Sequence, residues 1–263
     1  MRHGLALPSM APADRLIELA VTAENSGWDA VFLDDHVRMP PGSGLEPHDP
    51  WVLLGAIAHA TGRIRLGAMV TPLARRRPHK FAKEVATLDH VSGGRVITGV
   101  GLGNLPDDEF AAFGDEPDAK IRAERTDEAL KLVAGFWSGD RIVHHGKHFT
   151  VDAELRPVPV QRPRPPLWIA CGWPARRPLA RARRWDGAII IDRERGFLDP
   201  AGVSAVVAAL GPVPEGFDVI ALRAPGQAPA GYAAAGATWL LEARAPAGDW
   251  LSELEATAGR APG

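Results

Sequence analysis

Three short segments of the chain combine side chains that could transfer a proton or bind a cofactor. The first is Asp34-Asp35-His36, which follows an apolar run and sets an imidazole beside carboxylates. Histidine titrates near neutral pH and can donate or accept a proton, so His36 and Asp35 are candidate catalytic residues. A polar turn after a strand would have the same composition. The chemistry therefore depends on where the fold places this pair.

The second segment is the glycine-rich run Gly-Val-Gly-Leu-Gly-Asn from Gly99 to Asn104. Glycine lets a planar ring or an anionic group come close to the backbone and leaves the amide groups free to donate hydrogen bonds. Glycines at the end of a strand also occur because the chain turns tightly there. The run is compatible with a binding site, and a tight turn is the alternative.

The third segment is Cys-Gly-Trp-Pro-Ala-Arg-Arg from Cys171 to Arg177, in which an apolar run leads into a helix that opens with two arginines. Helix amides and guanidinium groups that converge on one anion make a phosphate site, whereas the alternative is a solvated basic turn. Cys171 is the only cysteine in the chain, which excludes an internal disulfide and a cysteine-based metal cluster. A reducing cytoplasm fits this composition.

Alternating apolar runs and helix-like segments must position these three groups. Eight such pairs predict parallel strands joined by crossover helices, closed into a (β/α)8 or TIM barrel that forms a single domain over residues 1–263. The active site of such a barrel lies at the carboxyl ends of the strands. The rival open dinucleotide-binding sheet would need a glycine-rich first turn and an acidic residue about 20 positions later, and the sequence has no such pair. The expected strands are 3–7, 29–34, 64–70, 96–101, 167–171, 187–191, 217–222 and 238–241, and the expected helices are 12–27, 50–61, 78–90, 122–137, 174–185, 200–210, 230–235 and 250–258.

Residues 138–166 fit neither element and form an excursion between the fourth helix and the fifth strand. The segments 141–144 and 148–151 flank His145-Gly146-Lys147 and predict a small hairpin. Five prolines between positions 157 and 166 then predict a stiff, extended connector into the next strand.

Composition and charge limit the partners. The chain has 30 basic and 32 acidic side chains and a net charge of -2, so neither nucleic acid nor an acidic membrane is an expected partner. No apolar run approaches the roughly 18 residues that span a membrane, and residues 1–15 lack the apolar region of a signal peptide. We expect a cytoplasmic protein that acts on a small molecule.

Metal-dependent hydrolysis is the competing chemistry for a barrel that carries Asp and His. It needs ligands that converge from different strands, and the strand ends do not offer them. His144, His145 and His148 cluster on the expected hairpin, where histidines more often contact solvent. The sequence also lacks a Gly-x-Ser-x-Gly nucleophile motif. No metal is expected, and the hydrolase remains a remote alternative.

Read together, the ends of the second to fifth strands resemble the bacterial luciferase-like family of flavin- and F420-dependent oxidoreductases, the luciferase-like monooxygenases. The resemblance is carried by residues 29–36, 63–72 and 84–103. Supporting stretches are Glu109-Phe110, Phe113-Gly114, 137–139, 165–169, 185–188 and 231–242.

The resemblance implies a barrel that binds FMN or coenzyme F420 at its mouth, with His36 and the adjacent Asp35 facing the reactive edge of the ring or the substrate. Ala68, Met69 and Val70 would support the ring, often through a non-prolyl cis peptide. Gly101, Leu102 and Gly103, followed by Asn104, would lie along the ring and the ribityl chain. The phosphate would lie among Cys171, Gly172, Trp173, Arg176 and Arg177.

Two departures from the family leave the reaction open. Sugar-phosphate dehydrogenases of the family have a glutamate where this chain has Asn104, and FMN monooxygenases often have an arginine near Leu102 that is missing here. The Asp-His pair favours F420 over FMN by a small margin. We expect a monooxygenase or dehydrogenase of a small organic substrate, with a non-catalytic flavin-binding relative as the alternative.

The expected helix 50–61 is apolar nearly all round. A helix on the surface of a barrel should have one apolar stripe, so this pattern predicts a homodimer through the helix. Luciferase-like proteins commonly dimerise through this region, which agrees with the prediction.

Overall fold

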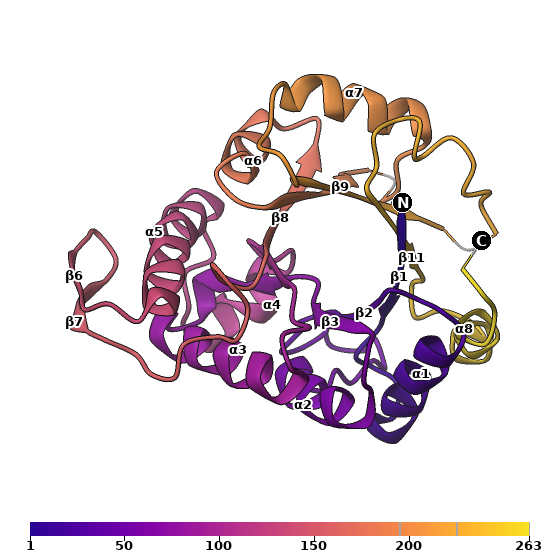
Figure 1. Ribbon diagram of the computed structural model, residues 1–263, viewed down its shortest axis with the longest axis horizontal. Coiled ribbons are helices and arrows are strands. Elements are labelled where there is room, and N and C mark those ends of the chain that lie inside the picture. The colour runs from indigo at the N-terminus through magenta and orange to yellow at the C-terminus, as the bar shows by residue number, and fades with distance from the viewer. Residues whose placement is uncertain (195, 225, 263) are drawn as a thin grey trace.

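Parallel strands around a ring form the centre of the molecule, and helices cover the outside of the ring (Figure 1). The computed structural model describes residues 1–194, 196–224 and 226–262. Over these residues the main sheet has nine strands in the order β3-β2-β1-β11-β10-β9-β8-β5-β4. Their bounds are β1 Arg2–Leu7, β2 Ala30–Leu33, β3 Arg65–Ala68, β4 Thr71–Pro72, β5 Thr98–Gly101, β8 Leu167–Trp173, β9 Gly187–Asp192, β10 Asp218–Arg223 and β11 Trp239–Ala243.

The sheet closes on itself at β3 and β4. These two strands occupy one strand position of the barrel wall, here called a stave, and are separated by Met69 and Val70. Leu66 of β3 bridges to Val96 just before β5, and Thr71 of β4 pairs with Val100 of β5. Nine strands with two of them in one stave give eight staves among the described residues. The predicted (β/α)8 barrel is confirmed.

Helices follow seven of the eight staves. They are α1 Ala13–Asn25, α2 Pro50–Ala60, α3 Pro78–Ser92, α5 Ala119–Ser138, α6 Arg176–Ala182, α7 Pro200–Leu210 and α8 Trp250–Ala258. Asp49 caps α2 by accepting a hydrogen bond from the amide of Val52 at 3.0 Å, and Pro50 is the first helical residue, as the sequence predicts.

The expected helix at residues 230–235 is wrong, because this stretch forms consecutive turns. Gly231 and Gly236 have φ angles of +88° and +99°, in the left-handed region that a helix cannot use. The amide of Ala235 donates a hydrogen bond to the carbonyl of Gly231 at 2.9 Å, and the amides of Gly236 and Ala237 close tight turns by bonding to the carbonyls of Ala233 and Tyr232. The seventh crossover is therefore made by turns.

The excursion is confirmed as a hairpin, with β6 Ile142–His145 antiparallel to β7 Thr150–Ala153. It projects from the side of the barrel next to α5 (Figure 1). Glu128 of α5 holds it there by accepting hydrogen bonds from the amides of His148 and Phe149 at 3.0 and 2.8 Å. The hairpin thus lies on the outside of the barrel.

Two apolar layers fill the interior, as expected for strands buried on both faces. One layer lies between the sheet and the helices. The other fills the lumen of the barrel, where the Trp168 ring lies 5.6 Å from Phe32 and 5.2 Å from Trp239. The lumen layer comprises Ala30, Phe32, Ile97, Trp168, Ile189, Ile220, Trp239 and Leu241, with Met69, Val70, Ile191 and Leu222 partly buried against it.

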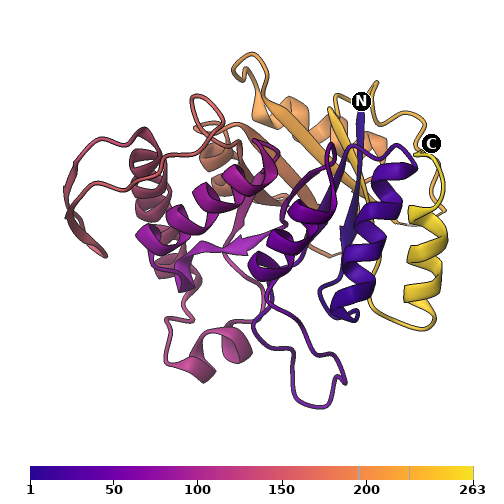
Figure 2. The ribbon, with the colours of Figure 1, turned by 60° about the horizontal axis from the view of Figure 1, so that its bottom comes forward.

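Long connections project at the end of the barrel where the strands finish (Figure 2). One is the loop of residues 37–49 after β2. The other follows β5 and contains the short helix α4 Pro106–Glu109 and the 3₁₀ helix η2 Ala111–Phe113. A further 3₁₀ helix, η1 Leu73–Arg75, follows β4. These segments surround the mouth of the barrel.

None of the helices among the described residues has both the length and the apolar character that crossing a bilayer requires.

Because the barrel closes between β3 and β5, we expect the stability of the fold to depend strongly on Gly67. A Cβ at this position would lie 1.8 Å from the carbonyl oxygen of Ile97, so Gly67→Ala must push the two staves apart. We expect it to lower the free energy of unfolding by more than about 3 kcal/mol, measured by urea denaturation. Gly55→Ala is the matched control, since nothing lies within 4 Å of a Cβ there and the change should stabilise α2 by about 0.5–1 kcal/mol. Equal effects of the two substitutions would contradict this view of the closure.

Candidate active site

Asp34 is the carboxylate that faces the mouth from the end of β2. Side chains alternate along a strand, and Phe32 lies in the lumen while Leu33 lies in the outer layer, so Asp34 faces the lumen side. Its Oδ1 accepts a hydrogen bond from the amide of Ser9 at 2.8 Å and a second from the Ser9 hydroxyl. Burial raises the pKa of Asp34 and outweighs these hydrogen bonds. Asp34 belongs to the Asp34-Asp35-His36 motif but was not among the predicted catalytic residues.

Asp35 points away from the mouth, into a buried cluster behind β2. Its carboxylate accepts hydrogen bonds from Arg75 at 2.8 Å and from Arg76 at 2.9 Å, and the indole N–H of Trp51 lies 3.4 Å from Oδ2. Arg75 also donates to the Asp35 carbonyl at 2.6 Å. This geometry places Asp35 in a supporting position, where it anchors the end of β2 to η1 and α2.

His36 faces Glu109, which comes from α4 in the connection after β5. The Nδ1 atom of His36 lies 3.3 Å from Oε2 of Glu109, and the imidazole is 18% exposed while the carboxylate is 1% exposed. Burial lowers the pKa of His36, but contact with Glu109 and the charge of Asp34 outweigh burial, so the pKa is raised. The described structure therefore places the imidazole against one carboxylate, that of Glu109, and under the influence of the charge of a second, Asp34.

Arg75 connects these groups. Besides its bonds to Asp35, its Nη1 lies 3.2 Å from Oε1 of Glu109. Its guanidinium also lies 5.9 Å from the centre of the Phe110 ring, over which Arg122 lies at 4.5 Å. Arg75, Arg122 and the contact between Glu109 and His36 were not predicted from the sequence. The only signal for them was the three-arginine run after the third expected strand and the family-like Glu109-Phe110 pair.

The glycines at the end of β5 make room for neighbouring side chains. A Cβ on Gly101 would lie 2.4 Å from Cγ2 of Val70, and one on Gly103 would lie 2.8 Å from the Phe110 ring. Gly103 also has a φ of +79°. Arg122 donates hydrogen bonds to the carbonyls of Leu102 at 2.6 Å and Gly103 at 3.2 Å, which fixes this exit.

The peptide between Met69 and Val70 is cis, as the family resemblance implied. The amide of Met69 donates to the carbonyl of Leu33 at 2.7 Å. Met69 and Val70 lie at the top of the lumen layer, whereas Ala68 is buried in the outer layer. Of the three, Met69 and Val70 thus present side chains to the mouth.

At the end of β8, Gly172 belongs to the lumen-facing series with Trp168 and Ala170, while Cys171 is buried in the outer layer. Burial raises the pKa of the Cys171 thiol to about 12, so its side chain is neither a ligand at the mouth nor a reactive thiolate. A Cβ on Gly172 would lie 2.9 Å from Cγ of Arg193, a residue that the sequence analysis missed.

Arg176 and Arg177 at the start of α6 are exposed, and no ion pair joins either to another described residue. The Arg176 guanidinium lies 5.3 Å from the centre of the Trp173 ring. Next to Trp173 is a cavity of about 370 Å³, also lined by Asp192, Phe197, Leu198, Asp199, Gly202 and Gln227. Asn104, the remaining candidate, is exposed. Roles for these residues in cofactor binding stay predictions.

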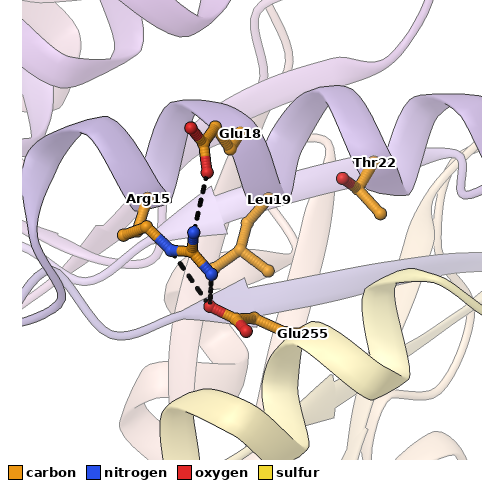
Figure 3. A pocket seen from close by; sticks show the side chains of 5 residues that line it. All are labelled: Arg15, Glu18, Leu19, Thr22 and Glu255. Atoms are coloured by element: carbon orange, nitrogen blue, oxygen red, sulfur yellow. Dashed lines mark hydrogen bonds and ion pairs between the residues drawn. The ribbon is translucent and has the colours of Figure 1, made fainter.

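Two other features outside the mouth have local explanations. Arg15 lies in a hollow between α1 and α8, where it pairs with Glu18 at 3.1 Å and with Glu255 (Figure 3). On the hairpin, His144 pairs with Glu128 at 2.8 Å. Among the residues that the structure describes, no three His, Cys, Asp or Glu side chains come together as a metal site. The hydrolase alternative has no ligand set to support it there.

The buried position of Arg75 predicts a large contribution to stability. Arg75→Met would leave Asp35 and Glu109 buried with fewer partners, and we expect it to lower the free energy of unfolding by about 3–5 kcal/mol. Arg38→Met is the control, because Arg38 is 40% exposed and lies 3.7 Å from Asp108, a surface pair worth less than about 1 kcal/mol. Chemical denaturation measures both, and a cost for Arg75→Met as small as that of the control would refute the assignment.

Comparison with known proteins places the barrel in a family. The sequence model described as luciferase-like monooxygenase matches residues 1–224. An F420-dependent glucose-6-phosphate dehydrogenase from Amycolatopsis mediterranei is 37% identical over 179 residues, which cover 66% of this chain and 52% of that protein. The chain spans about half the length of the curated relatives it matches, from 46% to 52% for the first two.

Solved structures share the fold. The F420-dependent tetrahydromethanopterin reductase from Methanopyrus kandleri has a TM-score of 0.77 and 16% identity, with 98% of this chain and 97% of that chain covered. The oxygenating constituent of 3,6-diketocamphane monooxygenase from Pseudomonas putida, in complex with FMN, has a TM-score of 0.67 and 22% identity, with 84% and 66% covered. By its match over residues 1–224, the chain belongs to the luciferase-like monooxygenase family.

Proposed function

We propose that the chain is a flavin- or deazaflavin-dependent oxidoreductase that acts on a small organic substrate. The observation that carries the proposal is the end of β2 at the mouth of the barrel, where Asp34 faces the lumen side and His36 lies against the buried carboxylate of Glu109. Membership of the luciferase-like family and similarity to an F420-dependent dehydrogenase support it.

The residues at the mouth fit such a cofactor. Met69 and Val70, with Ile191 and Leu222, offer an apolar floor for a planar ring. Gly172 leaves the end of β8 without a side chain, and Arg176, Arg177 and Arg193 lie close by in sequence or contact to balance a phosphate. When bound, either cofactor would supply hydride transfer, and FMN could also supply oxygen chemistry.

His36 is the proposed proton donor or hydrogen-bonding group. A raised pKa keeps the imidazole protonated to higher pH than an ordinary histidine, so it can donate to a developing negative charge on the substrate or the ring. Asp34, on the same strand end, adds a carboxylate to the mouth, while Asp35 supports the pair from behind.

F420 is the favoured cofactor, because the curated relatives include F420-dependent dehydrogenases and an Asp-His pair is present. FMN stays the second candidate, as does a monooxygenase reaction. Asn104 takes the place of the glutamate in sugar-phosphate dehydrogenases, so we do not assign a sugar phosphate as substrate. We place the enzyme in the cytoplasm on the basis of its single cysteine and balanced charge.

Titration of the purified protein with F420 and FMN, followed by absorbance and fluorescence, tests the proposal. We expect one of them to bind and the double substitution Arg176→Ala, Arg177→Ala to weaken binding at least about tenfold, since two cations near the phosphate are lost. Arg183→Ala, an exposed arginine at the far end of α6, is the control and should leave binding unchanged.

Failure of both cofactors to bind would overturn the oxidoreductase assignment. If one of the cofactors binds, the activities of the wild type and of His36→Ala separate an enzyme from a non-catalytic relative. In an enzyme it should leave cofactor binding intact and reduce the turnover of a panel of alcohols and sugars, whereas a binding protein would show no turnover in either form.

We further propose a homodimer through α2. The inner face of this helix packs into the core through Trp51, Leu54 and Ile57, as one apolar stripe requires. The outer face is also apolar, with Val52 75% exposed and Ala56 exposed beside it. An apolar outer face on a surface helix supports contact with a second copy.

Light scattering after size exclusion tests this dimer. We expect twice the chain mass for the wild type and a shift toward the monomer for Val52→Glu, because the interface would bury an unpaired charge. Ala205→Glu, on an exposed position of α7, should keep the wild-type mass. A monomeric wild type would refute the dimer, and an unaffected Val52→Glu protein would refute the role of α2.

A further inference from the structure

His36 and Glu109 are buried partners that depend on each other. Nδ1 of His36 and Oε2 of Glu109 lie 3.3 Å apart, and each is a buried atom without a fully formed hydrogen bond to any described residue. Hydrogen bonds in active sites are often long before the substrate binds and tighten in the complex. Within the described structure, each of the two atoms therefore has the other as its partner.

Two further contacts fix the Glu109 carboxylate, both through its other oxygen. Oε1 accepts a hydrogen bond from the amide of Val37 at 2.8 Å and lies 3.2 Å from Nη1 of Arg75. Burial raises the pKa of Glu109, but the contacts with His36, Arg75 and Val37 outweigh it, so the pKa is lowered and the carboxylate is charged near neutral pH. Glu109 thus presents a fixed negative charge to Nδ1 of His36.

We propose that Glu109 is a positioning residue for His36. The Glu109 carboxylate keeps a proton on Nδ1 of His36 and leaves Nε2 as the nitrogen that exchanges protons at the mouth. A neutral imidazole can carry its proton on either nitrogen, and the partner of one nitrogen decides the state of the other. No described residue forms a hydrogen bond to Nε2, and the ring is partly exposed. The catalytic meaning of the pair rests on the proposed function, but the pair itself does not.

Other charged groups also act on His36, and their effects must be distinguished from that of Glu109. Asp34 comes from the end of β2 and favours the protonated imidazole, whereas Arg75 from η1 disfavours it. Asp35 is held by Arg75 and Arg76. Asp108, next to Glu109 in α4, pairs with Arg38 at 3.7 Å. Asp108 therefore provides a matched carboxylate in the same helix that has a different partner.

Nuclear magnetic resonance of the cofactor-free protein tests the proposal. The ring signals of His36, assigned by their loss in His36→Gln, give its titration midpoint and its tautomer from the two ring ¹⁵N shifts. We expect a midpoint above that of an ordinary histidine and a proton held on Nδ1 in the neutral ring. Glu109→Gln should lower the midpoint and let the proton distribute over both nitrogens, because the glutamine keeps the shape and loses the charge.

Asp108→Asn is the control and should leave both the midpoint and the tautomer as in the wild type. Glu109→Asp, which keeps the charge one methylene farther away, should restore part of the shift, and it also provides the comparison if Glu109→Gln does not fold. An unchanged midpoint and tautomer in Glu109→Gln, or an equal change in Asp108→Asn, would overturn the proposal. If the pair behaves as expected but neither F420 nor FMN binds, the positioning role stands and the oxidoreductase assignment fails.

Discussion

The mouth of this barrel depends on the guanidinium of Arg75, which offsets two buried carboxylates. Asp35 and Glu109 are each 1% exposed, and Arg75 lies 2.8 Å from the first and 3.2 Å from the second. A carboxylate this deeply buried stays charged only when it is paired and hydrogen-bonded. Because Asp35 lies just after β2 and Glu109 is the last residue of α4, one side chain from η1 links three separate segments. The orientation of His36 follows, since it comes directly after Asp35 in the chain and its Nδ1 lies 3.3 Å from Oε2 of Glu109.

The barrel was predictable from sequence because its signal is periodic. Apolar runs that alternate with helix-like segments have one common solution at this length, and the closure between β3 and β5 confirms it. The direction of individual side chains was not predictable in the same way. All four residues of β2 are buried, since the strand is covered on both faces. Nothing in the composition of Ala-Val-Phe-Leu tells which face is the lumen, so the sequence does not show that Asp34, and not Asp35, faces the mouth.

The contacts of Arg75, Glu109 and Arg122 lay beyond sequence reasoning for another reason. They join segments 20 to 72 residues apart through loops that have no periodic pattern. An arginine run such as Arg75-Arg76-Arg77 also reads as a solvated patch, although only Arg77 of the three is exposed. Burial of a cation becomes visible only when the fold brings its carboxylates together. The prediction of a helix at 230–235 was wrong for a local reason. It rested on the alanine content of this stretch, whereas Gly231 and Gly236 adopt a conformation that a helix does not allow.

The glycines at the end of β5 have a different role from the one that the glycine-rich motif predicts. The sequence suggested that Gly101 lets a ring approach the backbone directly, yet Val70 already occupies the space above it, 2.4 Å from where a Cβ would be. A ring that enters over β5 would therefore meet the methyl groups of Val70 first. Gly101 then acts by letting Val70 lie low against the strand, and Gly103 acts in the same way by admitting Phe110. Since Arg75 and Arg122 both lie over Phe110, the glycine exit and the His36–Glu109 pair are parts of one packed structure. A side chain added at Gly103 would press on Phe110 and, through it, on Arg75, which lies against Glu109.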